Sequence, residues 1–299
     1  MSTFFLNPVY RISPFTTSDY AKNIQRINAR HEHEHEHEHE KLIIKNGYNT
    51  YFTESGRQAI QYYLASLQLN CDDEVTIITT TSSYYISSCV TATVEKYCKW
   101  NRQVTNKTKC IIVIHEFGKL YENVQQLLQY NIPILEDFAH SFSALTHTEN
   151  IHGDAAIFSL SKFLPINSGG LILSKAKLLE IKNSDEYCYF YKIYSNKIPI
   201  FIRKRKLIEN YYIKKFQELN LRPYFTYRND EAPGVFVVNI NKPIDYLQKL
   251  KIYLQSNFVE CSVFYKNESL FLPCHHRLEF EDIDYIFTLI KGYINNHDH

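Results

Sequence analysis

The sequence lacks an excess of charge of either sign, because 33 basic and 32 acidic residues leave a formal net charge of +1 at pH 7. This balance gives no reason to expect nucleic acid or an anionic membrane surface as the main partner. Long apolar runs are also missing. The longest, such as Cys110–Ile114, are far short of the roughly 20 residues that a membrane span needs. We therefore expect no membrane-spanning segment.

Signals of secretion are missing as well. The N-terminal sequence MSTFFLNPVYRISPFTTSDY has no basic region followed by an apolar stretch, so we predict no signal peptide. None of the seven cysteines forms a CxxC pair, and their number is odd. Reduced, mostly buried thiols in a cytoplasmic protein are the better interpretation. The cysteines are Cys71, Cys89, Cys98, Cys110, Cys188, Cys261 and Cys274.

The chain does have enough apolar residues for a sizeable core: 44% of its 299 residues are hydrophobic. That length suits one large domain, or a large domain and a small one. Short apolar runs alternate with segments of helical spacing, which is typical of an α/β protein with a mostly parallel sheet. We predict strands at Glu74–Thr79, Cys110–His115, Ile132–Glu136, Ala155–Ser159 and Gly170–Ser174, and helices at Glu54–Leu67, Tyr84–Thr93 and Glu122–Tyr130.

The pattern changes after about residue 180. Residues 180–230 are rich in Lys, Tyr and Ile and read as helices that lead away from the main sheet. Strands are predicted at Val235–Ile240 and Glu260–Tyr265, and helices at Ile244–Gln255 and Phe280–Asn295. We therefore predict a large α/β domain over residues 1–231, with helices on both faces of its sheet, and a small C-terminal α+β domain over residues 232–299.

Residues 1–30 are mixed, with Pro8 and Pro14 interrupting any long element, and a strict HE repeat follows at His31–Glu40. Alternating histidines could bind transition metals. A metal site also needs fixed geometry and supporting partners, and the repeat gives no sign of either. We favour a solvated low-complexity insertion, and we predict no metal site.

Three segments could carry chemistry. Asp137 ends a buried strand, where an acid can reach a ligand crevice, although a helix-capping aspartate is the common alternative. Lys162 follows another strand end and precedes an apolar segment. It is either a solvated surface charge or a desolvated amine available as a nucleophile. Thr53–Ala59 opens a helix with a glycine, which suits a phosphate seat or an ordinary capped helix start.

The order of these segments makes them more specific together than apart. A phosphate seat, a strand-end acid and a strand-end lysine are what pyridoxal 5′-phosphate (PLP) requires. The lysine forms a Schiff base, the acid keeps the pyridine nitrogen protonated, and the helix start with a nearby hydroxyl holds the phosphate.

Six ordered motifs lie between about residue 50 and residue 295. They are Ser55–Ala59 (SGRQA), Asp73–Val75 (DEV), Ile114–Gly118 (IHEFG), Ile134–His140 (ILEDFAH), Gly153–Ser159 (GDAAIFS) with Lys162 and Gly169-Gly170, and Leu272–Leu278 (LPCHHRL) with Glu281–Ile283 (EDI). Through these motifs the chain resembles the DegT/DnrJ/StrS family of sugar aminotransferases, which have the fold-type I architecture.

The resemblance implies a role for each matching position. Lys162 would bond to the cofactor and later transfer protons, and Asp137 would pair with the pyridinium nitrogen. Phosphate binding would fall to Ser55, Gly56, Arg57 and Ser159, with Gly56 and Arg57 acting through backbone N–H groups. His140 stands where the family usually has glutamine near the ring hydroxyl. A ring from the Tyr84-Tyr85 region, assigned to Tyr84, would stack on the cofactor.

The same resemblance implies transamination of a nucleotide-linked keto-sugar with an amino acid such as glutamate as donor, by a homodimer, in amino-sugar or polysaccharide synthesis. Two departures leave alternatives open. Only two residues separate Ser159 from Lys162 where the family commonly has four, and the segment at 175–232 is shortened, with Arg228-Asn229 as a candidate remnant. The alternatives are a PLP enzyme for small amino or keto acids, and a non-catalytic scaffold.

Overall fold

The computed structural model describes residues 10–12, 15, 17–33, 42–83, 85–179, 181–265 and 267–297. Its seven-stranded sheet, here called the large sheet, has the order β1-β7-β6-β5-β4-β2-β3. Strands β2 to β6 are parallel, whereas β7 is antiparallel to β6 and β1 to β7, so the prediction of a mostly parallel sheet is confirmed. The strands are β1 (Asn49–Thr53), β2 (Glu74–Thr79), β3 (Lys99–Asn101), β4 (Thr108–Ile114), β5 (Ile134–Asp137), β6 (Ala155–Ser159) and β7 (Gly170–Ser174).

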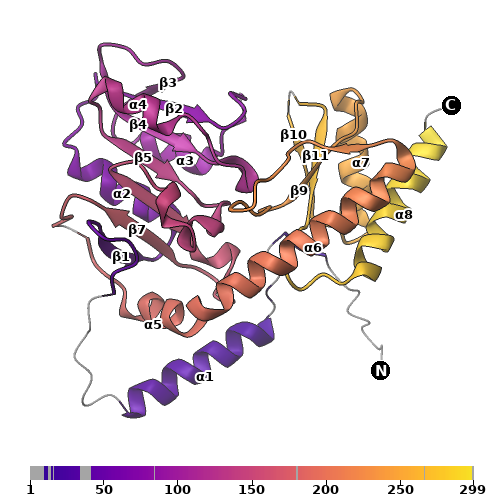
Figure 1. The fold of residues 1–299 in the computed structure, drawn as a ribbon, viewed down its shortest axis with the longest axis horizontal. Coiled ribbons are helices and arrows are strands. Elements are labelled where there is room, and N and C mark those ends of the chain that lie inside the picture. The colour runs from indigo at the N-terminus through magenta and orange to yellow at the C-terminus, as the bar shows by residue number, and fades with distance from the viewer. Residues whose placement is uncertain are drawn as a thin grey trace.

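Helices cover both faces of the large sheet, because successive side chains of its buried strands point to opposite sides. On β6, Ile157 packs in one cluster with α2 (Gly56–Ser66) and α3 (Ser88–Val94), while Phe158 packs in another with α5 (Asp185–Tyr194). Apolar residues therefore follow one another at Ala155–Phe158 of β6 and at Cys110–Ile114 of β4. Figure 1 shows the helices on either side of the sheet.

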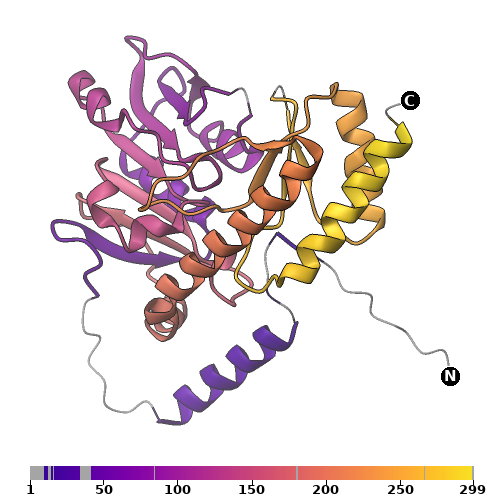
Figure 2. The same ribbon diagram turned by 45° about the vertical axis from the view of Figure 1, so that its right-hand side comes forward.

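A second, four-stranded antiparallel sheet has the order β10-β11-β9-β8. The long helix α6 (Ile198–Phe216) runs from α5 to this small sheet, where its C-terminal half enters the core with α7 and α8. Figure 2 shows α7 and α8 on the outer side of the small sheet. The remaining elements are β8 (Arg222–Pro223), β9 (Phe236–Asn239), α7 (Ile244–Ser256), β10 (Ser262–Phe264), β11 (Ser269–Leu272) and α8 (Phe280–His297).

The domain boundary at residue 231 stays a prediction. Strand β8 belongs to the small sheet but precedes that boundary, and α6 has buried residues in both halves of the molecule. No helix within the described ranges is long and apolar enough to cross a membrane.

Helix α1 (Thr17–His33) was not expected, since residues 1–30 read as mixed. It contacts the large-sheet half through Asn23, which donates to the Pro165 carbonyl, and through Arg26, which donates to the Tyr194 hydroxyl. The first three residues of the HE repeat lie in this helix, and the rest of His31–Glu40 lies outside the described residues. Among the residues that are described, no cluster of His, Cys, Asp and Glu could hold a metal ion.

The helix predicted at Tyr84–Thr93 begins later, at Ser88, so its predicted start was wrong. Ser87 caps it, because its hydroxyl accepts a hydrogen bond from the Cys89 N–H at 3.2 Å. Serine competes with the helix for such bonds and therefore favours the cap position over the interior. The helix predicted at Glu122–Tyr130 is shorter too, with α4 (Val124–Leu127) followed by a 3-10 turn at Leu128–Tyr130.

Candidate active site

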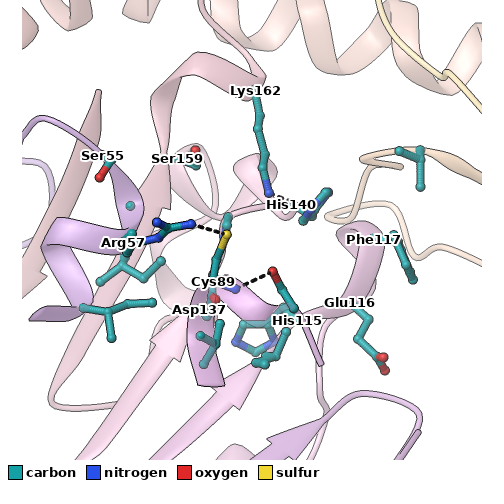
Figure 3. A pocket seen from close by; sticks show the side chains of 18 of the residues that line it. Ser55, Arg57, Cys89, His115, Glu116, Phe117, Asp137, His140, Ser159 and Lys162 are labelled. Carbon is teal, nitrogen blue, oxygen red and sulfur yellow. Dashed lines mark hydrogen bonds between the residues drawn. The ribbon is translucent and has the colours of Figure 1, made fainter. Parts of the chain in front are cut away.

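A cavity of about 480 Å³ lies where the parallel strands β4, β5 and β6 end. Crevices at the carboxyl ends of such strands are where α/β proteins bind their ligands. Three of its lining residues, His115, Asp137 and Ser159, lie at these strand ends, and α2 contributes its first turn. The opposite wall includes Val235 and Phe271 from the small-sheet half, so both halves of the molecule line the cavity. Figure 3 shows the cavity from close by.

The start of α2 forms one end of the cavity. Ser55 is the N-cap, and its hydroxyl accepts from the Gln58 N–H at 3.1 Å. The N–H groups of Gly56 and Arg57, at the first two helical positions, have no partner within the helix and can receive an anion. Gly170 fixes this turn against β7, because a Cβ there would lie only 2.4 Å from the Ser55 backbone.

Ser159 lies directly behind this helix start. A Cβ built on Gly56 would be 3.5 Å from the Ser159 Cβ, which is an ordinary contact distance. The end of β6 therefore brings a hydroxyl group next to the free N–H groups of α2. The family resemblance assigned phosphate binding to Ser55, Gly56, Arg57 and Ser159, and all four line one cavity.

The Arg57 side chain points across the cavity to Cys89 on α3 (Figure 3), with its guanidinium 2.9 Å from the Sγ atom. This hydrogen bond is the main reason why the pKa of Cys89 is lowered, against the opposing effect of burial. Cys89 was not predicted as a site residue. The local sequence carries no signal for it, because the contact with Arg57 forms only when α3 packs beside the start of α2.

Lys162 ends a short 3-10 turn that follows β6, and its side chain reaches into the cavity (Figure 3). The amine Nζ lies 2.6 Å from Nε2 of His140. Removal of the amine from water lowers the pKa of Lys162, although the charges of Asp137 and Cys89 act in the opposite direction. A lowered pKa increases the share of the neutral, nucleophilic amine.

Asp137 is the last residue of β5 and is only 6% exposed. One carboxylate oxygen, Oδ1, accepts from the Ala139 N–H at 2.8 Å. Burial raises the pKa of this carboxyl group, while the Ala139 N–H, Lys162 and His115 partly offset the rise. The carboxyl group and the lysine amine therefore interact electrostatically in the same cavity.

His140 completes this group. Its pKa lies well below the ordinary value, first because the ring is buried and then because Lys162 and Arg205 carry positive charge nearby. The imidazole is therefore neutral and can exchange a hydrogen bond with the amine. Gly234 packs against it so closely that a Cβ there would lie 2.8 Å from the His140 carbonyl oxygen.

His115 and Glu136 form a buried pair beneath the cavity, with Nε2 of His115 3.1 Å from Oε2 of Glu136. The other ring nitrogen, Nδ1, accepts from the Tyr121 N–H, so Nε2 carries the proton and donates it. The His115 ring stacks on Phe138 at a centroid distance of 4.1 Å. The sequence placed His115 at a strand end but did not indicate its partner, which comes from a neighbouring strand.

Aromatic residues form the wall on the small-sheet side. Tyr85 and Phe117 stack with their centroids 6.1 Å apart, and Phe271 lies 5.2 Å from Phe117. Tyr84, which was predicted to stack on the cofactor, lies outside the described residues. Its neighbour Tyr85 lines the cavity.

Arg228-Asn229 was considered as a remnant of a pocket segment. In the structure the Arg228 side chain forms an ion pair with Asp230 at 3.0 Å and a longer one with Glu122 at 3.5 Å. Neither Arg228 nor Asn229 is among the residues that line the cavity.

Comparison with known proteins gives a consistent result. A family model described as "Putative PLP-dependent aminotransferase" matches residues 36–211, more than half of the chain. None of the curated protein sequences compared with the chain is a significant match.

Several solved structures share the fold. The PMP form of Spr1654 from Streptococcus pneumoniae, described as a "Putative sugar aminotransferase", has a TM-score of 0.75 at 14% identity, covering 99% of this chain and 100% of its own. NtdA from Bacillus subtilis with bound PMP gives 0.72 at 14% identity, with 97% and 85% covered. Helicobacter pylori PseC, an aminotransferase of pseudoaminic acid biosynthesis, gives 0.71 at 14% identity, with 97% and 100% covered. The chain thus belongs to the family of PLP-dependent aminotransferases, has their fold-type I architecture, and uses PLP as its cofactor.

Proposed function

We propose that this aminotransferase transfers an amino group from an amino acid, with glutamate as the expected donor, to a nucleotide-linked keto-sugar in amino-sugar or surface-polysaccharide synthesis. The observation that carries the proposal is that Lys162 and Asp137 line one cavity together with a helix start suited to phosphate. The choice of a sugar acceptor is supported by the sequence resemblance and by the sugar aminotransferases among the structural neighbours.

The residues present fit PLP. The cavity of about 480 Å³ lies within the range of about 300–1,000 Å³ that is common for cofactor sites. An amine with a lowered pKa, a buried carboxyl group and free N–H groups beside a serine hydroxyl are the groups that the aldehyde, the ring nitrogen and the phosphate need. When bound, PLP supplies a protonated ring that withdraws electrons from the substrate's reacting carbon.

The two catalytic residues in this proposal are Lys162 and Asp137. Nζ of Lys162 would hold the cofactor through its aldehyde carbon, and the free amine would serve as the group that moves a proton at the substrate's reacting carbon. Its hydrogen bond to His140 orients the amine for this transfer. The carboxyl group of Asp137, which accepts a hydrogen bond from the Ala139 N–H, would hold the proton on the ring nitrogen of the cofactor.

The other proposed contacts bind and orient the cofactor. Ser159 and Ser55 contribute hydroxyl groups, and Gly56 and Arg57 contribute backbone N–H groups to the phosphate. Placing His140 near the ring hydroxyl and Tyr84 on the ring face follows the family resemblance. We also propose a homodimer, a cytoplasmic location, and large and small domains that meet near residue 231.

A half-reaction tests this function directly. Protein saturated with PLP is mixed with glutamate, and the change in absorbance from the PLP to the PMP form is followed. The PMP form is then offered a panel of nucleotide-linked keto-sugars, and separately pyruvate and oxaloacetate. Conversion of the PMP form back to the PLP form by a keto-sugar supports the proposal. Return to the PLP form with the small keto acids alone supports the small-acid alternative. No absorbance change with glutamate supports the non-catalytic scaffold.

A further inference from the structure

Helix α6 carries a guanidinium group into the junction between the two halves of the molecule. Arg205 is 1% exposed, whereas its neighbours Arg203 and Lys204 are exposed. Nη2 of Arg205 donates to the main-chain carbonyl of Lys162 at 3.2 Å. Nη1 donates to the carbonyls of Gly234 at 3.0 Å and Cys274 at 2.9 Å, with a longer contact to that of Pro233.

This buried cation has no carboxylate partner in the part of the chain that the structure describes, since carbonyl oxygens are its acceptors. Its guanidinium lies 4.5 Å from the centroid of the Phe163 ring, and its Nε atom makes no hydrogen bond there. Burial lowers the pKa of Arg205 to about 10, so the group is still charged at neutral pH. An apolar side chain of similar volume is often more stable than an imperfectly compensated buried charge, so packing alone does not explain this arginine.

The carbonyl groups that Arg205 binds belong to segments around Lys162. Gly234 packs directly against His140, and its N–H donates to the Phe117 carbonyl at 2.7 Å. His140 in turn contacts the Lys162 amine. Arg205 therefore reaches Lys162 by two routes, through the main-chain carbonyl of that residue and through Gly234 and His140.

We infer that Arg205 is a positioning residue, which fixes the main chain of Lys162 and holds His140 against the Lys162 amine. The inference rests on the proposed role of Lys162. The planar guanidinium suits this function because it offers several N–H donors in a fixed geometry, which a lysine ammonium cannot reproduce.

The charge of Arg205 acts in the same place. It contributes to the lowered pKa of His140, after burial and Lys162, and so favours the neutral ring that can accept a hydrogen bond from the amine. The other titratable groups whose pKa responds to Arg205 are His275, His276 and Cys274. Those that face Lys162 are Asp137, Cys89 and His140.

The test compares Arg205→Met and Arg205→Lys with Arg203→Met, an exposed control on the same helix. Each protein is saturated with PLP, and the visible absorbance of the lysine-bound cofactor is titrated with pH. We expect Arg205→Met to move the midpoint upward by about half a unit or more, because a positive charge is lost. The rate of the half-reaction with saturating glutamate should fall about 10- to 100-fold with little change in KM for glutamate.

Arg205→Lys separates geometry from charge. The pH midpoint of its absorbance should stay near that of the wild type, because the positive charge remains. The rate of its half-reaction with glutamate should fall, because a lysine ammonium cannot make the same set of hydrogen bonds as the guanidinium. If Arg205→Met folds and shows the wild-type midpoint and rate, the positioning role is overturned. Should Arg205→Met fail to fold, Arg205→Lys decides: a wild-type rate in that variant also overturns the inference. A wild-type protein without the absorbance band would instead sink the proposed function itself.

Discussion

The amine of Lys162 lies 2.6 Å from Nε2 of His140, and the imidazole is neutral because burial and nearby positive charges lower the pKa of His140. A neutral imidazole can accept a hydrogen bond from the ammonium form of Lys162 and, as the other tautomer, donate one to the free amine. His140 can therefore stay hydrogen-bonded to Lys162 whether the lysine is an ammonium or a free amine. Through this contact Lys162, the proposed proton carrier, is connected to His140 and to Gly234, which packs against His140.

Replacing His140 tests that contact. We expect His140→Leu to lower kcat about 10- to 100-fold, since a hydrogen bond to a charged group contributes roughly 1.5–3 kcal/mol. His140→Gln should retain much of the rate because its amide can both donate and accept. The measurement is kcat at saturating donor and acceptor. Equal rates for the Leu and Gln variants would show that the hydrogen bond has no catalytic effect.

Asp137→Asn should separate activity from stability. The folded state raises the pKa of this carboxyl, so the folded protein keeps a proton that the unfolded chain loses, and stability falls as pH rises through the folded pKa. The cofactor-free Asn variant should therefore melt at a higher temperature than the wild type at pH 8, with a smaller difference at pH 4. In the PLP-saturated protein, Asp137→Asn should lower the transaminase activity at least about 100-fold, because the carboxylate that would pair with the protonated ring nitrogen is lost. If cofactor-free Asp137→Asn melts at a lower temperature than the wild type at pH 8, the buried carboxyl group of Asp137 does not destabilise the folded protein and the prediction fails.

A second buried carboxyl gives an independent prediction about pH. Burial raises the pKa of Glu209, on α6, from 4.5 to about 7, partly offset by Lys206. Stability should therefore fall as pH rises from about 4.5 to about 7 and change little above that. Glu209→Gln should remove this dependence and stabilise the protein by about 1–3 kcal/mol at pH 8. Urea unfolding at pH 4.5 and 8 measures the effect, with the exposed Glu186→Gln as control. If the urea unfolding curves of Glu209→Gln and the wild type coincide at both pH values, Glu209 is not the source of the pH dependence.

Gly118 supports the wall of the cavity through its backbone. It has φ +101, and a Cβ there would lie 2.0 Å from the Ala232 carbonyl oxygen. Gly118→Ala should destabilise the protein by about 2–4 kcal/mol and displace Phe117, which lines the cavity. Gly292→Ala is the matched control, since a Cβ on this helical glycine meets nothing within 4 Å. It should be neutral or stabilising by up to about 1 kcal/mol. Thermal unfolding of both variants decides, and comparable melting temperatures would mean that the backbone at Gly118 relaxes easily.

The parts of the site that could be predicted depend on short-range sequence. Asp137 and Ser159 end apolar runs that form buried strands, and parallel strands bring such ends to one edge. Gly56 and Lys162 could be placed in the same way, because each follows or opens a regular element. The strand order then brings together residues that are far apart in the chain.

The parts that could not be predicted depend on approach between distant segments. Arg205 reads as one more basic residue in a Lys- and Arg-rich helix, and only packing of α6 across the junction buries it. Helix α1 has few apolar residues, with Ile27 packed against the large-sheet core and Ile24 59% exposed, so its sequence offers few apolar positions from which a helix could be predicted. Strand β1 is short and pairs with β7, which lies more than a hundred residues away.

The central claim is that Lys162 is the residue to which the cofactor bonds, and reductive trapping tests it most directly. The protein is incubated with PLP, reduced with borohydride and digested, and the peptides are identified by mass spectrometry, with Lys162→Ala as control. We predict one phosphopyridoxyl group, on the peptide that contains Lys162, and none at that site in the variant. A label on other lysines while Lys162 stays unmodified would contradict the account.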